Sequence, residues 1–170
     1  MAALVLAGTP AFAQEKEDLD SQYAVSLVKA GTDAPALSLK SMDGKAVSLS
    51  DYKGKWVVLD FWASWCPDCR KDIPDVVRLY KKFHPKGVEF IGISFDTDRA
   101  AWEKAVKDSG LEWTQTCELV RMSKSAVAQS YGVGWIPSMV IVDPDGKVSL
   151  STVTLSKAEA ALEKAFPEKK

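Results

Sequence analysis

Two short apolar runs, 56–61 and 88–95, enclose one amphipathic segment, and this arrangement most limits the possible folds. The runs WVVLDF and VEFIGISF have the length and apolar content of buried β-strands. Between them, apolar residues recur on one face of a predicted helix that ends at His84-Pro85: Ile73, Val76, Val77, Tyr80 and Phe83. Because a strand, a crossover helix and a second strand make a parallel βαβ unit, we predict an α/β fold.

Turn residues and periodicity predict the remaining elements. We expect helices over 98–110 and from Ser123 to a Gly132 cap. A last helix opens with Ser156 and Glu159 in capping-box spacing and is followed by Pro167. We expect strands over 34–40, 45–50, 111–116, 138–142 and 147–151. Together these predict one α/β domain over 31–167, in which helices flank a central mixed sheet.

Charge and hydropathy exclude two kinds of partner. The chain carries 22 basic and 23 acidic residues and has no basic block interleaved with aromatics, so nucleic acid is not an expected partner. Its longest weakly polar run, Ala2–Ala13, is interrupted by Gly8, Thr9 and Pro10. That run is shorter than the about 20 residues that a spanning helix needs, so we predict a soluble protein.

The N-terminus has part of the pattern of an export signal. A short apolar stretch leads to Ala11-Phe12-Ala13, the small-x-small pattern that signal peptidase reads, but no basic residue precedes Lys16. We interpret 1–13 as the remnant of a signal peptide whose start lies upstream; an alanine-rich tail is the alternative. Residues 14–30 form an N-terminal arm, either a short helix or an extended segment. We therefore expect a periplasmic or otherwise exported bacterial protein.

The motif CPDC places Cys66 and Cys69 in CxxC spacing, which suits redox exchange, metal binding or a structural disulfide. A structural zinc site needs four ligands and a catalytic one usually three. Beyond the pair, the chain offers only Cys117, the single histidine His84 and carboxylates. A second CxxC is absent, so zinc is disfavoured, and Cys117 is interpreted as a small buried apolar residue.

Redox chemistry suits the placement of this motif, because Cys66 follows a predicted strand where a helix begins. Free N–H groups and the helix dipole there favour a negative sulfur, and such a position lowers a cysteine pKa from about 8.5 towards about 7. Pro67 suits the first helical position, where its missing N–H costs nothing. Cys69 lies one turn further on, so Cys66 is predicted to attack and Cys69 to resolve the mixed disulfide.

Two carboxylates are candidates for proton transfer. Asp60 ends the first apolar strand; if buried, it has a raised pKa and can exchange a proton with Cys69. Asp72 shares a helix face with Cys69 and can act similarly. The alternatives are a solvent-facing strand end for Asp60 and an acid that complements the helix dipole for Asp72.

The segment VVLDFWASWCPDC resembles the active site of thioredoxin-like proteins, and the wider match is to the exported TlpA/ResA-like thiol–disulfide oxidoreductases, which are related to AhpC/TSA proteins. The resemblance covers about residues 31–166 and includes YGVGWIPSMVIVDPDGKV. It implies a thioredoxin-like fold. It also implies an extra helix and strand, roughly within 102–132, inserted between the first βαβ unit and the C-terminal β-hairpin.

The resemblance also implies roles for individual residues. Pro137 matches the family's cis-proline and joins Cys66, Cys69, Asp60 and Asp72 in the predicted catalytic set. Trp65 resembles the aromatic lid beside the sulfur, and Ile136 offers backbone groups to an extended substrate; these two and Pro67 are the predicted substrate contacts. Pro74 matches the proline that bends the active-site helix.

The implied activity is the reduction of protein disulfides outside the cytoplasm, with apocytochromes among the candidate substrates in cytochrome c maturation. A membrane thiol carrier would supply electrons, the Cys66–Cys69 pair would be the only redox centre, and the protein would be a monomer. One alternative is a peroxiredoxin-like peroxidase, although Leu59 and Ala63 stand where that pattern has Pro and Thr or Ser. The other is a metal-binding module or metallochaperone on the same fold. The Pro-Asp pair between the cysteines leaves the direction of electron flow open.

Overall fold

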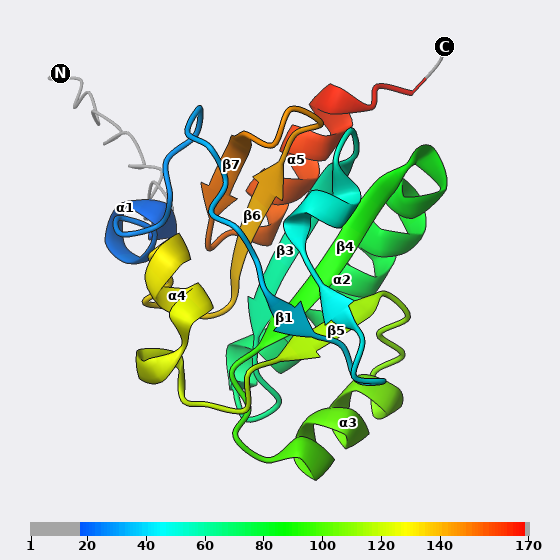
Figure 1. The fold of residues 1–170 in the computed structure, drawn as a ribbon. Helices are drawn as coiled ribbons and strands as arrows, with labels where there is room; N and C mark the ends of the chain where they lie inside the picture. Colours follow the sequence, from blue (N-terminus) through cyan, green and yellow to red (C-terminus); the bar gives the residue numbers. More distant parts are fainter. Residues whose placement is uncertain (1–17, 169–170) are drawn as a thin grey trace, which may run out of the picture.

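The computed structural model describes residues 18–168, and a mixed five-stranded sheet in the order β5-β4-β3-β6-β7 forms its centre (Figure 1). Its strands are β3 (Trp56–Trp62), β4 (Val88–Ser94), β5 (Thr114–Cys117), β6 (Ser138–Val142) and β7 (Val148–Thr152). β4 pairs in parallel with both β3 and β5. β6 pairs antiparallel with both β3 and β7. The predicted βαβ unit and mixed sheet are confirmed.

Helices cover both faces of the sheet. The helix α2 (Pro67–Phe83) joins β3 to β4 and packs beside α5 (Leu155–Ala165), where Arg78 donates hydrogen bonds of 2.7 and 2.9 Å to Glu159. The other α-helices are α1 (Leu19–Tyr23), α3 (Arg99–Asp108) and α4 (Ala126–Tyr131). In Figure 1, α4 lies to the left of the sheet, and a two-stranded hairpin of β1 (Leu39–Lys40) and β2 (Ala46–Val47) crosses in front of it.

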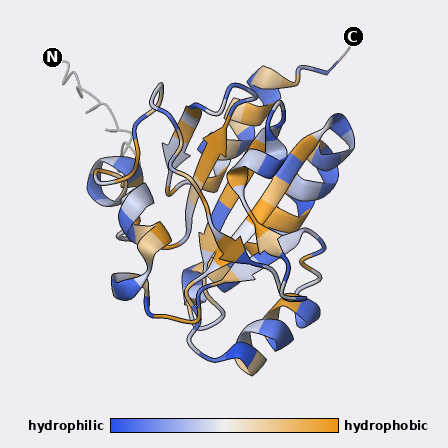
Figure 2. Cartoon of the chain, in the orientation of Figure 1, coloured by the Kyte–Doolittle hydropathy of each residue, from blue (hydrophilic) through white to orange (hydrophobic). Residues whose placement is uncertain are grey.

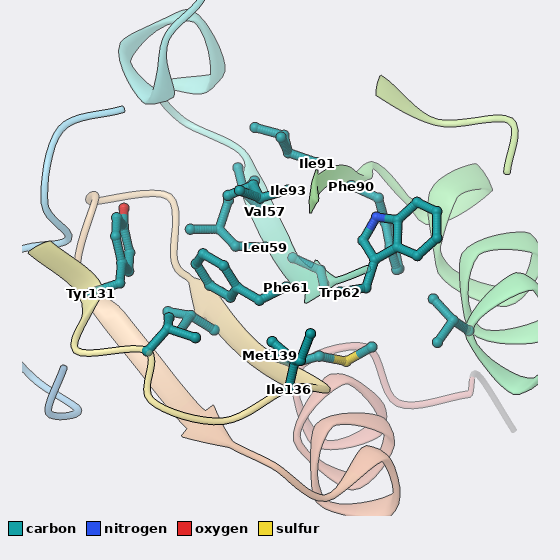
Figure 3. Close-up of a cluster of buried hydrophobic side chains, with 14 of the residues drawn as sticks. Val57, Leu59, Phe61, Trp62, Phe90, Ile91, Ile93, Tyr131, Ile136 and Met139 are labelled. Carbon is teal, nitrogen blue, oxygen red and sulfur yellow. The ribbon is translucent and has the colours of Figure 1, made fainter. Parts of the chain in front are cut away.

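The core forms around β3, whose residues from Val57 to Trp62 are all buried. In Figure 2, the hydrophobic colour is concentrated on the central strands of the sheet. In Figure 3, Phe61 lies beside Tyr131 of α4, with 5.7 Å between the ring centroids. Because helices cover both faces of β3, this strand carries Asp60 into the protein interior.

Two helix starts differ from the sequence prediction. The last helix begins at Leu155 with Thr154 as its N-cap, so the Ser156–Glu159 capping box is wrong. Ser156 is therefore inside the helix and cannot be its N-cap, and the Glu159 carboxylate binds Arg78. The helix expected from Ser123 begins at Ala126, because the Ser125 hydroxyl accepts the Ala128 N–H at 3.0 Å; its Gly132 cap is confirmed.

In the described part of the N-terminal arm, residues 18–30, α1 occupies Leu19–Tyr23, and residues 24–30 are not helical. The predicted signal-peptide remnant, 1–13, lies outside the described residues. Within residues 18–168, no helix combines the length and the apolar content needed to cross a membrane.

Candidate active site at the start of helix α2

Cys66 and Cys69 are joined by a disulfide at the N-terminus of α2, with 5.3 Å between their Cα atoms. Cys66 is the N-cap residue, and its Sγ accepts the Cys69 N–H at 3.1 Å. Pro67 occupies the first turn, as predicted. The helix dipole and the free N–H groups of this turn therefore point at the Cys66 sulfur, where they favour a thiolate in the reduced protein.

The Ile136–Pro137 peptide bond is cis, as the resemblance implies, and it lies against the disulfide. The Ile136 carbonyl oxygen is 3.8 Å from Cys66 Sγ. This is a van der Waals contact in the disulfide, which has no S–H; the reduced thiol can donate a hydrogen bond there. The loop is held because Ser138 begins β6 opposite Phe61 and donates to the Trp135 carbonyl at 2.5 Å.

Asp60 lies inside the protein, 6 % exposed, and burial raises its pKa to about 7, with a smaller contribution from the negative charge of Asp72. It lines a cavity of about 20 Å³ together with Cys69, Asp72 and Pro137. A cavity of that size has room for about one water molecule. Of the two positions considered for the Asp60 side chain, buried or facing solvent, the structure shows the buried one.

Asp72 is half-buried at the rim of the same cavity. Burial raises its pKa, the charges of Asp75 and Asp68 raise it further, and Lys71 opposes them. The structure thus places both predicted carboxylates on the cavity that Cys69 also lines.

Two of the three predicted substrate contacts are exposed beside the buried sulfur atoms, and the third is buried. The Trp65 side chain is 57 % exposed and Pro67 is exposed, while Ile136 is 8 % exposed. Trp135, which precedes Ile136, is 39 % exposed.

Asp96 is a residue of the site that the sequence reasoning missed. It is 2 % exposed, and its carboxylate accepts hydrogen bonds from the Ser64 N–H at 2.9 Å, the Ser64 hydroxyl at 2.5 Å and the Ser94 hydroxyl at 2.6 Å. These bonds hold the loop that leads from β3 to Cys66. The available signal was an acid soon after an apolar strand, because the carboxyl ends of parallel strands share one edge of a sheet.

The third cysteine, Cys117, is a free and buried thiol beside this cluster. Its Sγ donates to the Asp96 carbonyl at 3.2 Å, and burial raises its pKa. The interpretation of Cys117 as a small buried residue is confirmed. Among residues 18–168, no three or more His, Cys, Asp and Glu side chains converge in a way that could hold a metal ion.

The cysteine pair at a helix N-terminus, the neighbouring cis-proline and the mixed sheet define a thiol–disulfide oxidoreductase with a thioredoxin-like fold. A sequence model of the AhpC/TSA family matches residues 30–151, so this chain belongs to the AhpC/TSA family. Among curated relatives, the thiol-disulfide oxidoreductase ResA of Bacillus anthracis is 34% identical over 81% of this chain and 79% of its own length. The ResA protein of Bacillus subtilis is 32% identical, over 79% of this chain and 73% of its own length.

Solved structures agree with this assignment. A thiol-disulfide oxidoreductase from Bacteroides fragilis matches with a TM-score of 0.74 and 30% identity, over 79% of this chain and 100% of its own. The thioredoxin domain of a thiol-disulfide oxidoreductase from Bacteroides vulgatus matches with a TM-score of 0.73 and 33% identity, over 81% and 98% of the two chains. These similarities favour neither the peroxidase nor the metal-binding alternative.

Proposed function

We propose that this oxidoreductase reduces disulfides in protein substrates outside the cytoplasm of a bacterium, through a cycle between the Cys66–Cys69 dithiol and disulfide. The observation that carries this proposal is the position of Cys66 Sγ, at a helix N-terminus and 3.8 Å from the Ile136 carbonyl. The first feature favours a thiolate, and the second supplies backbone groups beside it.

The cycle begins with attack of the Cys66 thiolate on one sulfur of a substrate disulfide. A mixed disulfide forms, and the other substrate sulfur leaves as a thiolate that takes up a proton. Cys69 then loses its proton and attacks the Cys66 sulfur, which releases the second substrate thiolate. Two electrons pass to the substrate, and the Cys66–Cys69 disulfide remains.

The proton of Cys69 goes to Asp60, through one water molecule in the cavity that the two residues share. A pKa of about 7 suits Asp60 to take up and release a proton near neutral pH. Asp72, at the rim of the cavity, would pass the proton to solvent.

Ile136 and Pro137 would bind an extended substrate segment through the backbone, while Trp65 and Pro67 contact its side chains. A membrane thiol carrier outside the cytoplasm would return two electrons to the disulfide. Apocytochromes, whose cysteines must be reduced before haem attachment, are the proposed substrates. The protein would act as a monomer, with the disulfide as its only redox centre.

Cysteine variants test the cycle. We expect Cys66→Ser to abolish insulin reduction, and Cys69→Ser to accumulate mixed disulfides that nonreducing electrophoresis detects. Wild-type rates in Cys66→Ser would contradict the mechanism. The equilibrium potential of the pair against glutathione tests the direction: a value near about −270 mV supports a reductant, whereas one near about −120 mV would identify an oxidant.

A further inference from the structure

The N-terminal segment, residues 18–28, is attached to the rest of the protein at two separate places. At the first, the Asp20 carboxylate accepts hydrogen bonds from the Thr152 hydroxyl at 2.8 Å and the Val153 N–H at 2.7 Å. The same carboxylate pairs with Lys157 Nζ at 2.8 Å. These contacts join the segment to the end of β7 and the start of α5.

At the second place, the segment meets the C-terminal end of α4. Val28 N–H donates to the Tyr131 carbonyl at 3.0 Å, and the Ser26 hydroxyl donates to the Gly132 carbonyl at 2.7 Å. A Cβ atom on Gly132 would lie 1.8 Å from the Ser26 carbonyl oxygen, so only glycine allows this approach. Leu27 is buried here, with 2 % exposure.

Between these two attachments, Tyr23 stacks on Trp135, with ring centroids 4.1 Å apart and an interplanar angle of 24°. Trp135 immediately precedes Ile136, whose carbonyl contacts Cys66 Sγ. We call Tyr23 and Trp135 the aromatic wall. Because Trp135 is still 39 % exposed, the wall offers apolar surface to solvent next to the reactive sulfur.

We propose that the aromatic wall binds an apolar side chain adjacent to the disulfide cysteine of an extended substrate segment. This inference rests on the proposed function, because it assigns specificity to the same site. An aromatic surface gains most from apolar neighbours, and it is continuous with the Ile136 backbone that would hold the segment. Tyr23 acts by holding the Trp135 indole in place before substrate arrives, which lowers the entropy lost on binding.

Two symmetric peptide disulfides test this specificity, one with phenylalanine and one with serine next to each cysteine. Serine is chosen over an acid, because an acid would also meet the charge of Asp68 in the first turn of α2. The reduced protein is mixed with each peptide, and the rate of a single turnover is measured by acid quench and chromatography. We expect the wild type to react about fivefold faster with the phenylalanine peptide.

Substitutions in the N-terminal segment test whether the aromatic wall causes this difference in rate. We expect Tyr23→Ala to bring the ratio of the two rates close to one, and Tyr23→Phe, which keeps a stacking ring, to restore the preference. Asp20→Ala removes the first of the two attachments without changing either ring and is expected to reduce the preference too. Val25→Ala removes a 63 % exposed side chain from the same segment, and this variant should keep the preference for the phenylalanine peptide.

Bis(2-hydroxyethyl) disulfide, which has no side chain for the wall, measures the reactivity of the thiols alone, and Val25→Ala should reduce it at the wild-type rate. A wild type without preference, or a preference that persists in both Tyr23→Ala and Asp20→Ala, would overturn the inference and leave the proposed function intact. Failure of the wild type to reduce any of the three disulfides would instead contradict the proposed function.

Discussion

Replacing Asp60 with asparagine should change how the stability of the oxidised protein depends on pH. Burial raises the pKa of Asp60 from 3.8 to about 7. Between these two values the folded protein keeps the proton while the unfolded chain has lost it, so stability falls as pH rises. Below about 3.8 the carboxyl is neutral in both states and carries no penalty, and above about 7 the full penalty is present.

The size of the effect follows from the two pKa values. The difference between 3.8 and about 7 corresponds to a penalty of about 4 kcal/mol for the buried carboxylate at high pH. Asparagine has nearly the same shape and no charge. We therefore expect the free energy of unfolding of Asp60→Asn, relative to wild type, to rise by about 4 kcal/mol between pH 4 and pH 8.

Urea unfolding of the two oxidised proteins at several pH values measures this difference, and titrations that they share largely cancel in it. Asp75, an exposed acid on α2, supplies the control, because Asp75→Asn should show no such rise. A difference between Asp60→Asn and wild type that stays constant from pH 4 to pH 8 would refute the assignment of Asp60 as a buried acid with a raised pKa.

Two further substitutions test the packing around the site. Asp96→Ala should lower the free energy of unfolding by about 3 kcal/mol, because the Ser64 and Ser94 hydrogen bonds are lost; a loss below about 1 kcal/mol in urea would argue against a supporting role. Gly132→Ala should destabilise more than Gly146→Ala, since both have positive φ but only at Gly132 would a Cβ collide with the Ser26 backbone. We expect about 1 kcal/mol at Gly146 and at least about 2 kcal/mol more at Gly132, and equal midpoints of thermal unfolding in the two variants would contradict this.

Local signals were enough for much of the fold. Apolar runs over 56–61 and 88–95 predicted β3 and β4, and the amphipathic pattern between them predicted α2. The position of Cys66 at a helix start could also be read locally, because strand length and Pro67 mark the boundary. The Ser156–Glu159 box failed because the helix begins at Leu155, after the Thr154 N-cap, and the contact of Glu159 with Arg78 of another helix is one that no local pattern reveals.

By itself, the sequence determined which residues could exchange electrons and which elements carry them, because periodicity, helix caps and CxxC spacing act over a few residues. Only the tertiary structure decided that Asp60 is buried beside Cys69, that Asp96 holds the loop before Cys66, and that Tyr23 stacks on Trp135. The physical reason is that these contacts join segments far apart in the chain. They depend on strand register and helix packing, which place each side chain only after the whole sheet has formed.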